Sequence, residues 1–510
     1  MRYSYKIGQD EFWWCGSVSD GYRMPFGTKD EYELNFLINR TYNQVNPLLV
    51  SSKGRYVYVN GSCIIHASAG DLIISEASGD VVSESGFGTL KGAYLAAAKR
   101  LFKKRRAVPP LTYTAPQYCT WMETLRHLTQ EKVISYAESI AEKKMPAGCI
   151  ILDDGWMRDY GDWRFKEKEF PDPAAMIRRL HELGFKVMLW VCPFVSETAK
   201  DYAALEKKGV FVREKSGKTA LRVWWSGVSA LLDGTNPSAY GWLKEKLDFL
   251  QSEYGADGFK FDAGDAMYYE TDDLTFASVT PNGQSELWAD FANLYEYSEL
   301  RACVGKGGAA IVQRLSDKSS SWDEKRGLGS LVPNMIQAGL SGYPFCCPDM
   351  IGGGNETDYH GKTLKDAEFF ARSCECAALM PMMQFSRSYW RYGNGVEDLA
   401  VKYANLHASF GEYLRALAKE SAATGAPMLR NMEYEFPHCG MENIKDQFML
   451  GNKYLVAPVV CEGARTKKVV LPAGCDWLYV PENRLYAGGG EVEVSAPLDV
   501  LPYFERRERT

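Results

Sequence analysis

The sequence has little histidine and none of the spacings that mark common cofactor sites. Its six histidines form no His-x-His or His-Glu-x-x-His pattern, so metal-dependent hydrolysis, the rival use of clustered acids, is disfavoured and we expect no metal. The glycine clusters at residues 305–308 and 352–354 follow neither the P-loop nor the dinucleotide-binding spacing and are interpreted as turns. We therefore predict an activity that needs no cofactor.

Charge of one sign and long apolar runs are also lacking. The formal net charge of −6 gives no basic surface for nucleic acid, and the basic run at residues 99–106 is interpreted as a helix end or linker. No segment approaches the length of a membrane span, and residues 1–10 lack the apolar core of a signal peptide. Thirteen cysteines, an odd number scattered through apolar runs, are typical of reduced thiols. We expect a cytoplasmic protein without nucleic-acid or membrane partners.

The 510 residues divide by pattern into three regions of an α/β protein. Residues 1–108 alternate short β-branched and aromatic runs with turns, without helical periodicity, and predict an N-terminal β-sandwich. Residues 109–432 alternate strand-like runs with amphipathic stretches such as 131–144 and 174–183, and predict a (β/α)8 TIM barrel. Its strands are expected within residues 113–121, 148–154, 185–193, 258–262, 309–314, 343–347, 381–385 and 428–430. Residues 433–510 return to strands and predict a small C-terminal β domain.

Carboxylates recur where the predicted barrel strands end. Asp262 follows the apolar run from residue 258, and Asp153 and Asp154 end the run from residue 149. Asp317 and Asp349 follow two later strands. The carboxyl ends of barrel strands meet at one face, so these acids are expected to converge there. Any one of them alone has an ordinary interpretation as a helix cap or loop ion pair, but their recurrence favours an active site.

Acids gathered with aromatic rings indicate sugar chemistry. Aromatic residues make up 13% of the chain, and rings of this kind stack on sugars as well as filling cores. Trp190, Trp224 and Trp225 are candidate platforms, although Trp225 is equally compatible with a place in the core. Glycoside hydrolysis by retention needs two carboxylates, one that attacks the anomeric carbon and one that protonates the leaving oxygen. We expect Asp262 to stay ionised as the nucleophile, with a bell-shaped pH profile.

Several of these motifs resemble glycoside hydrolase family 31. The run Gly258-Phe-Lys-Phe-Asp262 is similar to the family's nucleophile signature, which implies that Asp262 is the nucleophile. Asp317, with Trp322 five positions on, is similar to the acid/base segment and implies that role, with Trp322 near the sugar. Asp349 before a Gly-Gly turn resembles a ligand of sugar hydroxyls. The resemblance further implies substrate-binding roles for Asp153 and Arg301, and the same three-part fold.

The sequence departs from the α-glucosidases of that family in ways that bear on the substrate. Their Arg-Asn-His-Asn segment is replaced by residues 383–386, Met-Gln-Phe-Ser, and the Trp two before their nucleophile is replaced by Lys260. Lys260 with the acid pair Asp153-Asp154 resembles the α-galactosidases of the related families 27 and 36, in which these groups grip hydroxyls of galactose. The resemblance therefore implies an exo-acting retaining α-galactosidase with a small oligosaccharide or glycoside as its partner.

Other functions stay open on the sequence. An α-glucosidase, an α-xylosidase, a sulfoquinovosidase or a mainly transglycosylating enzyme would use the same two acids. A sugar-binding protein without catalysis is the alternative from another class, because one fold can carry different functions. The linkage, the leaving group and assembly into a homo-oligomer have no readable signal in the chain.

Overall fold

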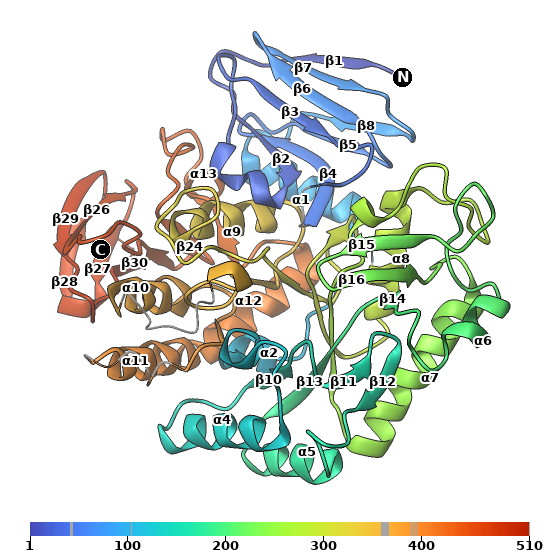
Figure 1. The fold of residues 1–510 in the computed structure, drawn as a ribbon. Helices are drawn as coiled ribbons and strands as arrows, with labels where there is room; N and C mark the ends of the chain where they lie inside the picture. The colour runs from blue at the N-terminus through green and yellow to red at the C-terminus, as the bar shows by residue number, and fades with distance from the viewer. Residues whose placement is uncertain are drawn as a thin grey trace.

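The computed structural model describes residues 1–40, 44–103, 105–358, 367–388, 390, 393 and 395–508. Two N-terminal sheets lie at the top of Figure 1, a barrel occupies the centre, and the C-terminal strands lie at the left. This arrangement confirms the predicted class, a TIM barrel flanked by two β-rich parts. The domain boundaries expected after residues 108 and 432 stay predictions. In the part of the chain described, no helix combines the length and the apolar character needed to cross a membrane.

The N-terminal part contains two antiparallel sheets. The first has the order β1 (Tyr3–Lys6), β7 (Asp71–Ser75), β6 (Ile64–Ser68) and β3 (Tyr32–Asn35). The second contains β4 (Gln44–Ser51), β5 (Tyr56–Val59) and β8 (Val81–Glu84), with β2 (Trp13–Ser17) also paired to β4. A short strand from the barrel region, β19 (Cys303–Val304), pairs in parallel with β4. The second sheet is therefore joined to the barrel by backbone hydrogen bonds.

The N-terminal part also contains a helix, which the strand-like pattern of residues 1–108 did not predict. Helix α1 (Leu90–Leu101) begins where the Thr89 side chain accepts a hydrogen bond from the Gly92 amide at 3.0 Å. Its alanines and leucines favour a helix, and its apolar face packs beside the β4–β5 sheet. The predicted helix end at residue 99 is the last turn of α1, which carries Lys99 and Arg100.

Eight parallel strands form the barrel. Their order is β21 (Cys346–Cys347), β20 (Val312–Arg314), β18 (Tyr297–Leu300), β17 (Gly258–Phe261), β13 (Lys186–Val191), β10 (Cys149–Leu152), β9 (Gln117–Cys119) and β22 (Gln384–Phe385). The two ends of this sheet meet at a parallel bridge between Met350 and Gln384, where the Ile351 amide donates to the Gln384 carbonyl at 2.8 Å. The barrel is nearly closed, so the carboxyl ends of its strands surround one central space.

One predicted barrel strand is wrong and one was missed. Residues 428–430 contribute β23 (Leu429–Arg430), which pairs with β24 (Phe448–Leu450) in the C-terminal sheet. The fifth barrel strand is instead β18, whose Ser298 and Glu299 break the apolar pattern expected of a buried strand. Both side chains are buried all the same. The segment 383–386 consequently belongs to the eighth barrel strand rather than the seventh.

Helices surround the barrel as expected for alternating strands and helices. They are α4 (Gln130–Glu142), α5 (Pro173–Glu182), α7 (Pro237–Tyr254), α8 (Pro281–Ala292), α9 (Leu331–Leu340), α10 (Ala367–Ala378), α11 (Val396–Ser409) and α12 (Gly411–Thr424). The helices predicted at 131–144 and 174–183 are confirmed as α4 and α5, which begin at side-chain caps from Thr129 and Asp172. Helix α9 is buried along its whole length, since the N-terminal turn η1 (Val18–Arg23), β2 and β23 pack against it.

A small sheet projects from the barrel between β13 and α7. Its order is β14 (Phe194–Val195), β16 (Gly227–Leu231) and β15 (Leu221–Trp224), so β15 lies at an edge. The C-terminal part contains a sheet of order β23, β24, β25 (Tyr454–Val456), β30 (Tyr503–Arg507), β27 (Asp476–Tyr479) and β28 (Arg484–Ala487). A separate pair, β26 (Thr466–Leu471) and β29 (Gly490–Ser495), completes it.

Candidate active site

A polar cavity of about 260 Å³ opens at the carboxyl ends of the barrel strands. Its lining residues are Trp121, Asp153, Asp154, Trp190, Trp225, Lys260, Asp262, Arg301, Arg314, Asp317, Asn355, Glu356 and Thr357. Eight of the eleven residues predicted for the site are in this list. The structure therefore brings together acids from strands that lie far apart in the sequence.

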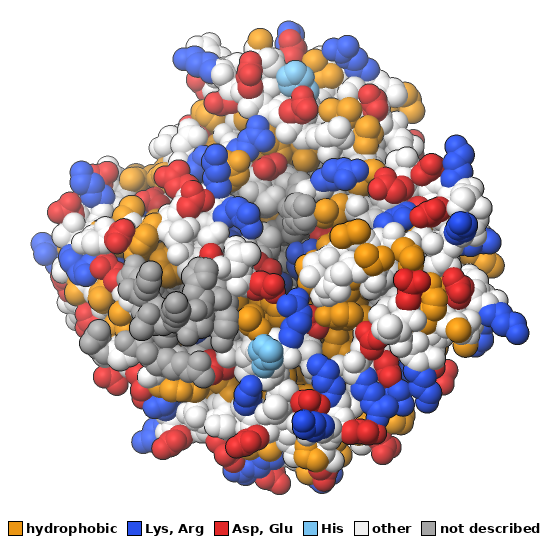
Figure 2. All heavy atoms as spheres, viewed as in Figure 1, with side chains coloured by type: hydrophobic (Ala, Val, Ile, Leu, Met, Phe, Trp, Pro, Cys, Tyr) orange, Lys and Arg blue, Asp and Glu red, His pale blue; other side chains and the backbone are white. Residues whose placement is uncertain are grey.

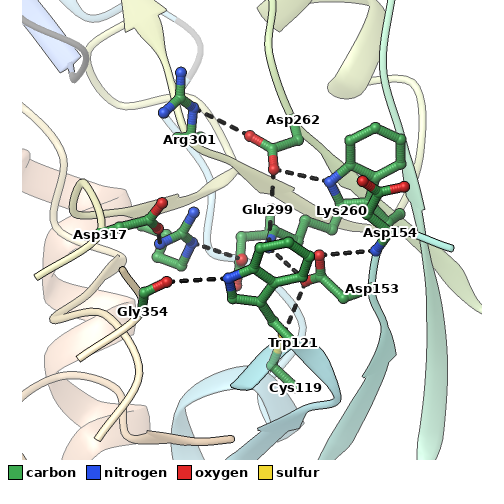
Figure 3. Close-up of polar contacts among 12 residues, drawn as sticks. Cys119, Trp121, Asp153, Asp154, Lys260, Asp262, Glu299, Arg301, Asp317 and Gly354 are labelled. Atoms are coloured by element: carbon green, nitrogen blue, oxygen red, sulfur yellow. Dashed lines mark hydrogen bonds and ion pairs between the residues drawn. The ribbon is translucent and has the colours of Figure 1, made fainter. Parts of the chain in front are cut away.

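Asp262 lies directly after β17 and is surrounded by donors. Trp190 Nε1 donates to Asp262 Oδ2 at 2.8 Å, and the Ala263 amide donates to Oδ1 at 2.9 Å. The Arg301 guanidinium forms an ion pair with Oδ1 at 3.1 Å, as Figure 3 shows. Burial alone would raise the pKa of Asp262, but the nearby Lys260, Arg301 and Arg314 charges and the indole hydrogen bond lower it to about 2. Asp262 is therefore ionised throughout the physiological pH range.

Lys260 and Asp153 form a buried ion pair across the barrel floor. Lys260 Nζ donates to Asp153 Oδ2 at 2.6 Å, and Lys260 Nζ lies 4.0 Å from Asp262 Oδ2. The thiol of Cys119 donates to the same Asp153 oxygen at 2.9 Å. Burial opposes the charge of Lys260, but the Asp153 carboxylate outweighs burial and raises the pKa of Lys260. This pair presents both a donor and an acceptor to the cavity.

Asp154, the residue after Asp153, has partners of its own. Arg126 Nε donates to Asp154 Oδ2 at 2.9 Å, and the Tyr160 hydroxyl donates to the same oxygen at 3.0 Å. Burial dominates over these contacts and raises the pKa of Asp154 to about 6. Its charge therefore changes within a pH range that is easily reached in an assay.

Asp317 follows β20 and is more accessible than the other acids. Its side chain is 37% exposed, and Arg314 Nη1 donates to its Oδ1 at 2.7 Å. The same Nη1 donates to Asp349 Oδ1 at 2.7 Å. An acid that exchanges protons with a substrate and with solvent requires such access. Asp262 and Asp317 thus line one cavity in different surroundings, one buried among donors and one partly exposed.

Asp349 lies behind Asp317 rather than among the lining residues. Its Oδ2 accepts hydrogen bonds from the Lys318 amide at 2.7 Å and the Gly354 amide at 3.1 Å. Burial raises the pKa of Asp349, with Arg314 opposing that effect. In this structure Asp349 fixes the loops after β20 and β21; the predicted contact with sugar hydroxyls stays a prediction.

The predicted tryptophans occupy different surroundings. Trp190 and Trp225 line the cavity, and the Arg301 guanidinium lies 4.8 Å from the ring centre of Trp225. Trp224 turns into the core of the small sheet, where it stacks on Phe194 with ring centres 4.3 Å apart. Trp322 packs edge-on against Phe369. Trp224 and Trp322 are absent from the lining drawn from the described residues, and their predicted sugar contacts stay predictions.

Several lining residues were missed by sequence reasoning. Arg314 is the last residue of β20 and was given no role in the site from the sequence. Trp121 lies in the four-residue helix α3 (Trp121–Thr124), where no periodicity is readable, and its Nε1 donates to the Gly354 carbonyl at 3.0 Å. Glu356 begins the short 3-10 helix η4 (Glu356–Asp358) and pairs with Arg126 at 3.2 Å. An arginine at the end of a barrel strand was the one signal available for Arg314.

Within the described ranges, no group of three His, Cys, Asp or Glu side chains is placed to hold a metal ion. The acids of the cavity are instead paired with cations of the chain itself. The charges alternate along the floor, from Asp153 to Lys260 and from Glu299 to Arg314, whose Nε lies 3.5 Å from Glu299 Oε1. The site is therefore a preorganised network of charged hydrogen bonds.

Comparisons with known proteins agree with this fold. A model described as the glycosyl hydrolases family 31 TIM-barrel domain matches residues 106–318, and one described as the family 31 C-terminal domain matches residues 425–509. Together they match more than half of the sequence. The chain belongs to glycoside hydrolase family 31.

Two curated relatives indicate the range of the family. The myogenesis-regulating glycosidase of Mus musculus is 36% identical over 389 residues, covering 74% of this chain and 54% of that protein. The sulfoquinovosidase of Escherichia coli (strain K12) is 25% identical over 369 residues, covering 68% of this chain and 53% of that protein. The chain thus spans about half the length of these relatives.

A solved structure supports the fold. The crystal structure of a family 31 α-xylosidase from a soil metagenome, complexed with xylose, superimposes with a TM-score of 0.86 at 21% identity. The match covers 99% of this chain and 79% of that chain. At this identity the likeness concerns the fold, and the substrate is argued from the site itself.

Proposed function

We propose that this chain is an exo-acting, retaining α-glycoside hydrolase that releases terminal α-linked galactose. The observation that carries the proposal is the state of Asp262, a carboxylate held ionised by Trp190 and Arg301 in a cavity that also contains Asp317. An ionised carboxylate fixed beside an accessible second acid is the pair that glycoside hydrolysis with retention requires. A cavity of about 260 Å³ suits a single terminal sugar.

The two acids have separate tasks in this proposal. Asp262 attacks the anomeric carbon and forms a covalent glycosyl–enzyme bond, while Asp317 gives its proton to the departing glycosidic oxygen. Asp317 then takes a proton from the water that attacks this intermediate, so the sugar leaves with its original configuration. The donors on Asp262 hold it in the attacking orientation, which lowers the entropic cost of reaching the transition state.

The charges of the cavity favour a neutral sugar. Five lining residues are acids (Asp153, Asp154, Asp262, Asp317 and Glu356), whereas three are cations (Lys260, Arg301 and Arg314). Each of these cations already contacts a carboxylate of the chain. A sulfonate or carboxylate on the sugar would therefore meet a surplus of negative charge. This argument weighs against the sulfonated substrate named for the Escherichia coli relative.

Galactose is favoured among neutral sugars by Lys260 and Asp153. Lys260 takes the place of the Trp that stands two residues before the nucleophile in the family's α-glucosidases, and its Nζ lies 2.6 Å from Asp153 Oδ2, so the pair offers a donor and an acceptor. The axial 4-hydroxyl of galactose can form hydrogen bonds with these groups. When the 4-epimer, glucose, binds instead, one of the groups is left without that partner, which costs about 1–3 kcal/mol. The paired acids Asp153 and Asp154 at the same strand end support the same substrate.

Initial rates on a panel of aryl α-glycosides test this proposal. The panel contains the galactoside, glucoside, xyloside, N-acetylgalactosaminide and sulfoquinovoside, with Asp262→Ala as the matched variant. Fast release from the galactoside alone, lost in the variant, is the expected result. Preference for another sugar would overturn the galactose assignment and keep the mechanism.

Azide separates the roles of the two acids. In Asp262→Ala, azide takes the place of the nucleophile and should yield the β-glycosyl azide. In Asp317→Ala, azide attacks the glycosyl–enzyme from the other face and should yield the α-glycosyl azide, provided that the leaving group is activated. The same anomer from both variants would contradict the assignment.

A further inference from the structure

Apolar side chains gather on the outer side of the hairpin formed by β15 and β16. Val223 is 78% exposed, Val228 50%, Trp225 41% and Leu221 36%. We call these four residues the hairpin surface. Figure 2 shows apolar side chains over this hairpin, beside the central hollow of the molecule. Four exposed large hydrophobic residues within a span of eight mark an interaction site more often than chance exposure.

Val223 and Val228 are exposed on the outer side of the hairpin, whereas Trp225 at its tip also contacts Trp224 and Tyr268. Val223 and Val228 lie opposite each other in the strand register, so their side chains share one face. Trp224, the next residue, points to the other face, where it packs on Phe194 and Tyr160. The buried face of the hairpin is thus already filled, and the valine face is left to solvent.

The tip of the hairpin belongs to the cavity. Trp225 lies in the turn between the strands and lines the cavity. The neighbouring Ser226 Oγ lies 2.9 Å from the Tyr160 hydroxyl, which also contacts Asp154 Oδ2 at 3.0 Å. The hairpin surface is therefore anchored to the wall of the sugar site, and Trp225 is part of both.

Other residues of the lining are polar near the mouth. Asn355, Glu356 and Thr357 contribute to the lining from the segment after β21 that includes η4, and Glu356 pairs with the partly exposed Arg126. The lining thus has Trp225 of the hairpin on one side and these polar residues from another segment. If the leaving group were a second sugar, its hydroxyls would face the valines and find no hydrogen-bond partners there. An alkyl or aryl leaving group would instead bury apolar area against the valines.

We propose that the hairpin surface binds the apolar leaving group of α-glycosides whose sugar occupies the cavity. The inference rests on the proposed function and specifies its substrate class as glycosides of alkyl or aryl alcohols. Trp225 carries the argument for this occupant, because it joins the surface to the cavity. Since β15 is an edge strand, a second copy of the chain is the competing occupant.

A series of alkyl α-galactosides tests the proposal. Ethyl, butyl, hexyl and octyl alcohols have nearly equal acidity, so the chemistry of departure stays constant while apolar area grows. Full burial of a methylene raises affinity about fourfold, and one-sided contact should raise kcat/KM about twofold per methylene until the chain passes Val228. All concentrations stay below micelle formation. A flat series in the parent protein would overturn the proposal.

Isosteric variants locate the effect. Val223→Thr/Val228→Thr keeps both side-chain shapes and adds hydroxyls, and should lower the octyl-to-ethyl ratio of kcat/KM at least fivefold. Leu485→Thr alters an exposed residue of the C-terminal sheet and should keep the parent ratio. An unchanged ratio in the double variant would overturn the proposal. So would sedimentation showing a parent dimer and a monomeric double variant, because the surface would then join subunits.

Binding without turnover keeps this test independent of the proposed function. Calorimetry on Asp262→Ala compares octyl with ethyl α-galactoside when no bond is broken. Tighter binding of the octyl compound, reduced by the valine substitutions, is the expected result. If the parent hydrolyses no glycoside of the series but shows this preference, the proposed function fails and the apolar site stands. If the two compounds bind equally, the apolar site fails.

Discussion

Arg314 Nη1 donates to Asp317 Oδ1 at 2.7 Å and so ties the proposed acid/base to the end of β20. Asp349 accepts from the same nitrogen, also at 2.7 Å. Asp349 in turn accepts from the backbone amides of Lys318 and Gly354. The direction in which Asp317 points is therefore set by a buried network.

Arg314→Lys should impair proton donation. Lysine keeps the positive charge but loses the planar fork that reaches two carboxylates. We expect kcat/KM for ethyl α-galactoside to fall about 100-fold, the lower end of what a general acid contributes. The 2,4-dinitrophenyl glycoside should lose little, because its leaving group departs without a proton. Arg158→Lys, at a surface ion pair, is the matched control. Equal losses on both substrates would show that Arg314 acts through binding or folding instead.

Trp190→Phe should weaken the nucleophile while keeping an aromatic ring in place. The variant removes the donor that lies 2.8 Å from Asp262 Oδ2. A hydrogen bond to a charged group contributes about 1.5–3 kcal/mol, so kcat should fall roughly 10- to 100-fold. Trp288→Phe is a matched control, since the buried Trp288 Nε1 has no partner among the residues that the structure describes. A similar loss in both variants would point to packing rather than to the hydrogen bond.

The sequence predicted the acids better than the groups that hold them. Asp153 follows the run Cys149-Ile-Ile-Leu152, which is apolar throughout because both faces of a parallel barrel strand are buried. Asp262 follows a run that is apolar apart from Lys260. Strand β18 was not predicted because its sequence contains the charged Glu299. This side chain points into the barrel, where Gln384 donates to it at 3.0 Å. That partner comes from a strand 85 residues away. No local pattern encodes such a pairing.

The same limit applies to side-chain direction. Trp224 and Trp225 are adjacent and chemically identical, yet one is buried in the small sheet and the other lines the cavity. Trp224 ends β15, whereas Trp225 lies in the turn between β15 and β16. The position of this turn depends on the packing of the whole small sheet. Alternation along a strand predicts opposite faces but not which face meets the sugar site.

Asp154→Asn should change how stability depends on pH. Burial raises the pKa of Asp154 to about 6, above its value in the unfolded chain. Between pH 4 and 6 the folded protein holds more protons than the unfolded one, so its free energy of unfolding falls as pH rises. Relative to the variant, the parent should lose about 2–3 kcal/mol between pH 4 and pH 7, as measured by urea denaturation. Asp10→Asn, at an exposed position, should track the parent. A pH-independent difference between parent and Asp154→Asn would contradict this expectation.

Lys318→Met should stabilise the protein at neutral pH, in contrast to most substitutions beside an active site. Lys318 follows Asp317 and is buried, and burial lowers its pKa to about 8, although Asp349 opposes the shift. Its Nζ lies 2.8 Å from the Asn334 amide oxygen when that amide is oriented to donate to the Val18 carbonyl. A lysine charged in such surroundings costs stability below pH 8. Methionine fills similar space without the charge.

The buried Lys318 also makes the free energy of unfolding of the parent protein depend on pH. Between pH 8 and 10 the unfolded chain holds the proton that folded Lys318 has released, so the parent gains stability as pH rises. Lys318→Met should therefore exceed the parent by about 1–3 kcal/mol at pH 7, and the difference should shrink by pH 9.5. Urea denaturation at both values measures this, with the exposed Lys215→Met as control. A variant less stable than the parent at pH 7 would mean that Asn334 and Asp349 fully compensate the buried charge.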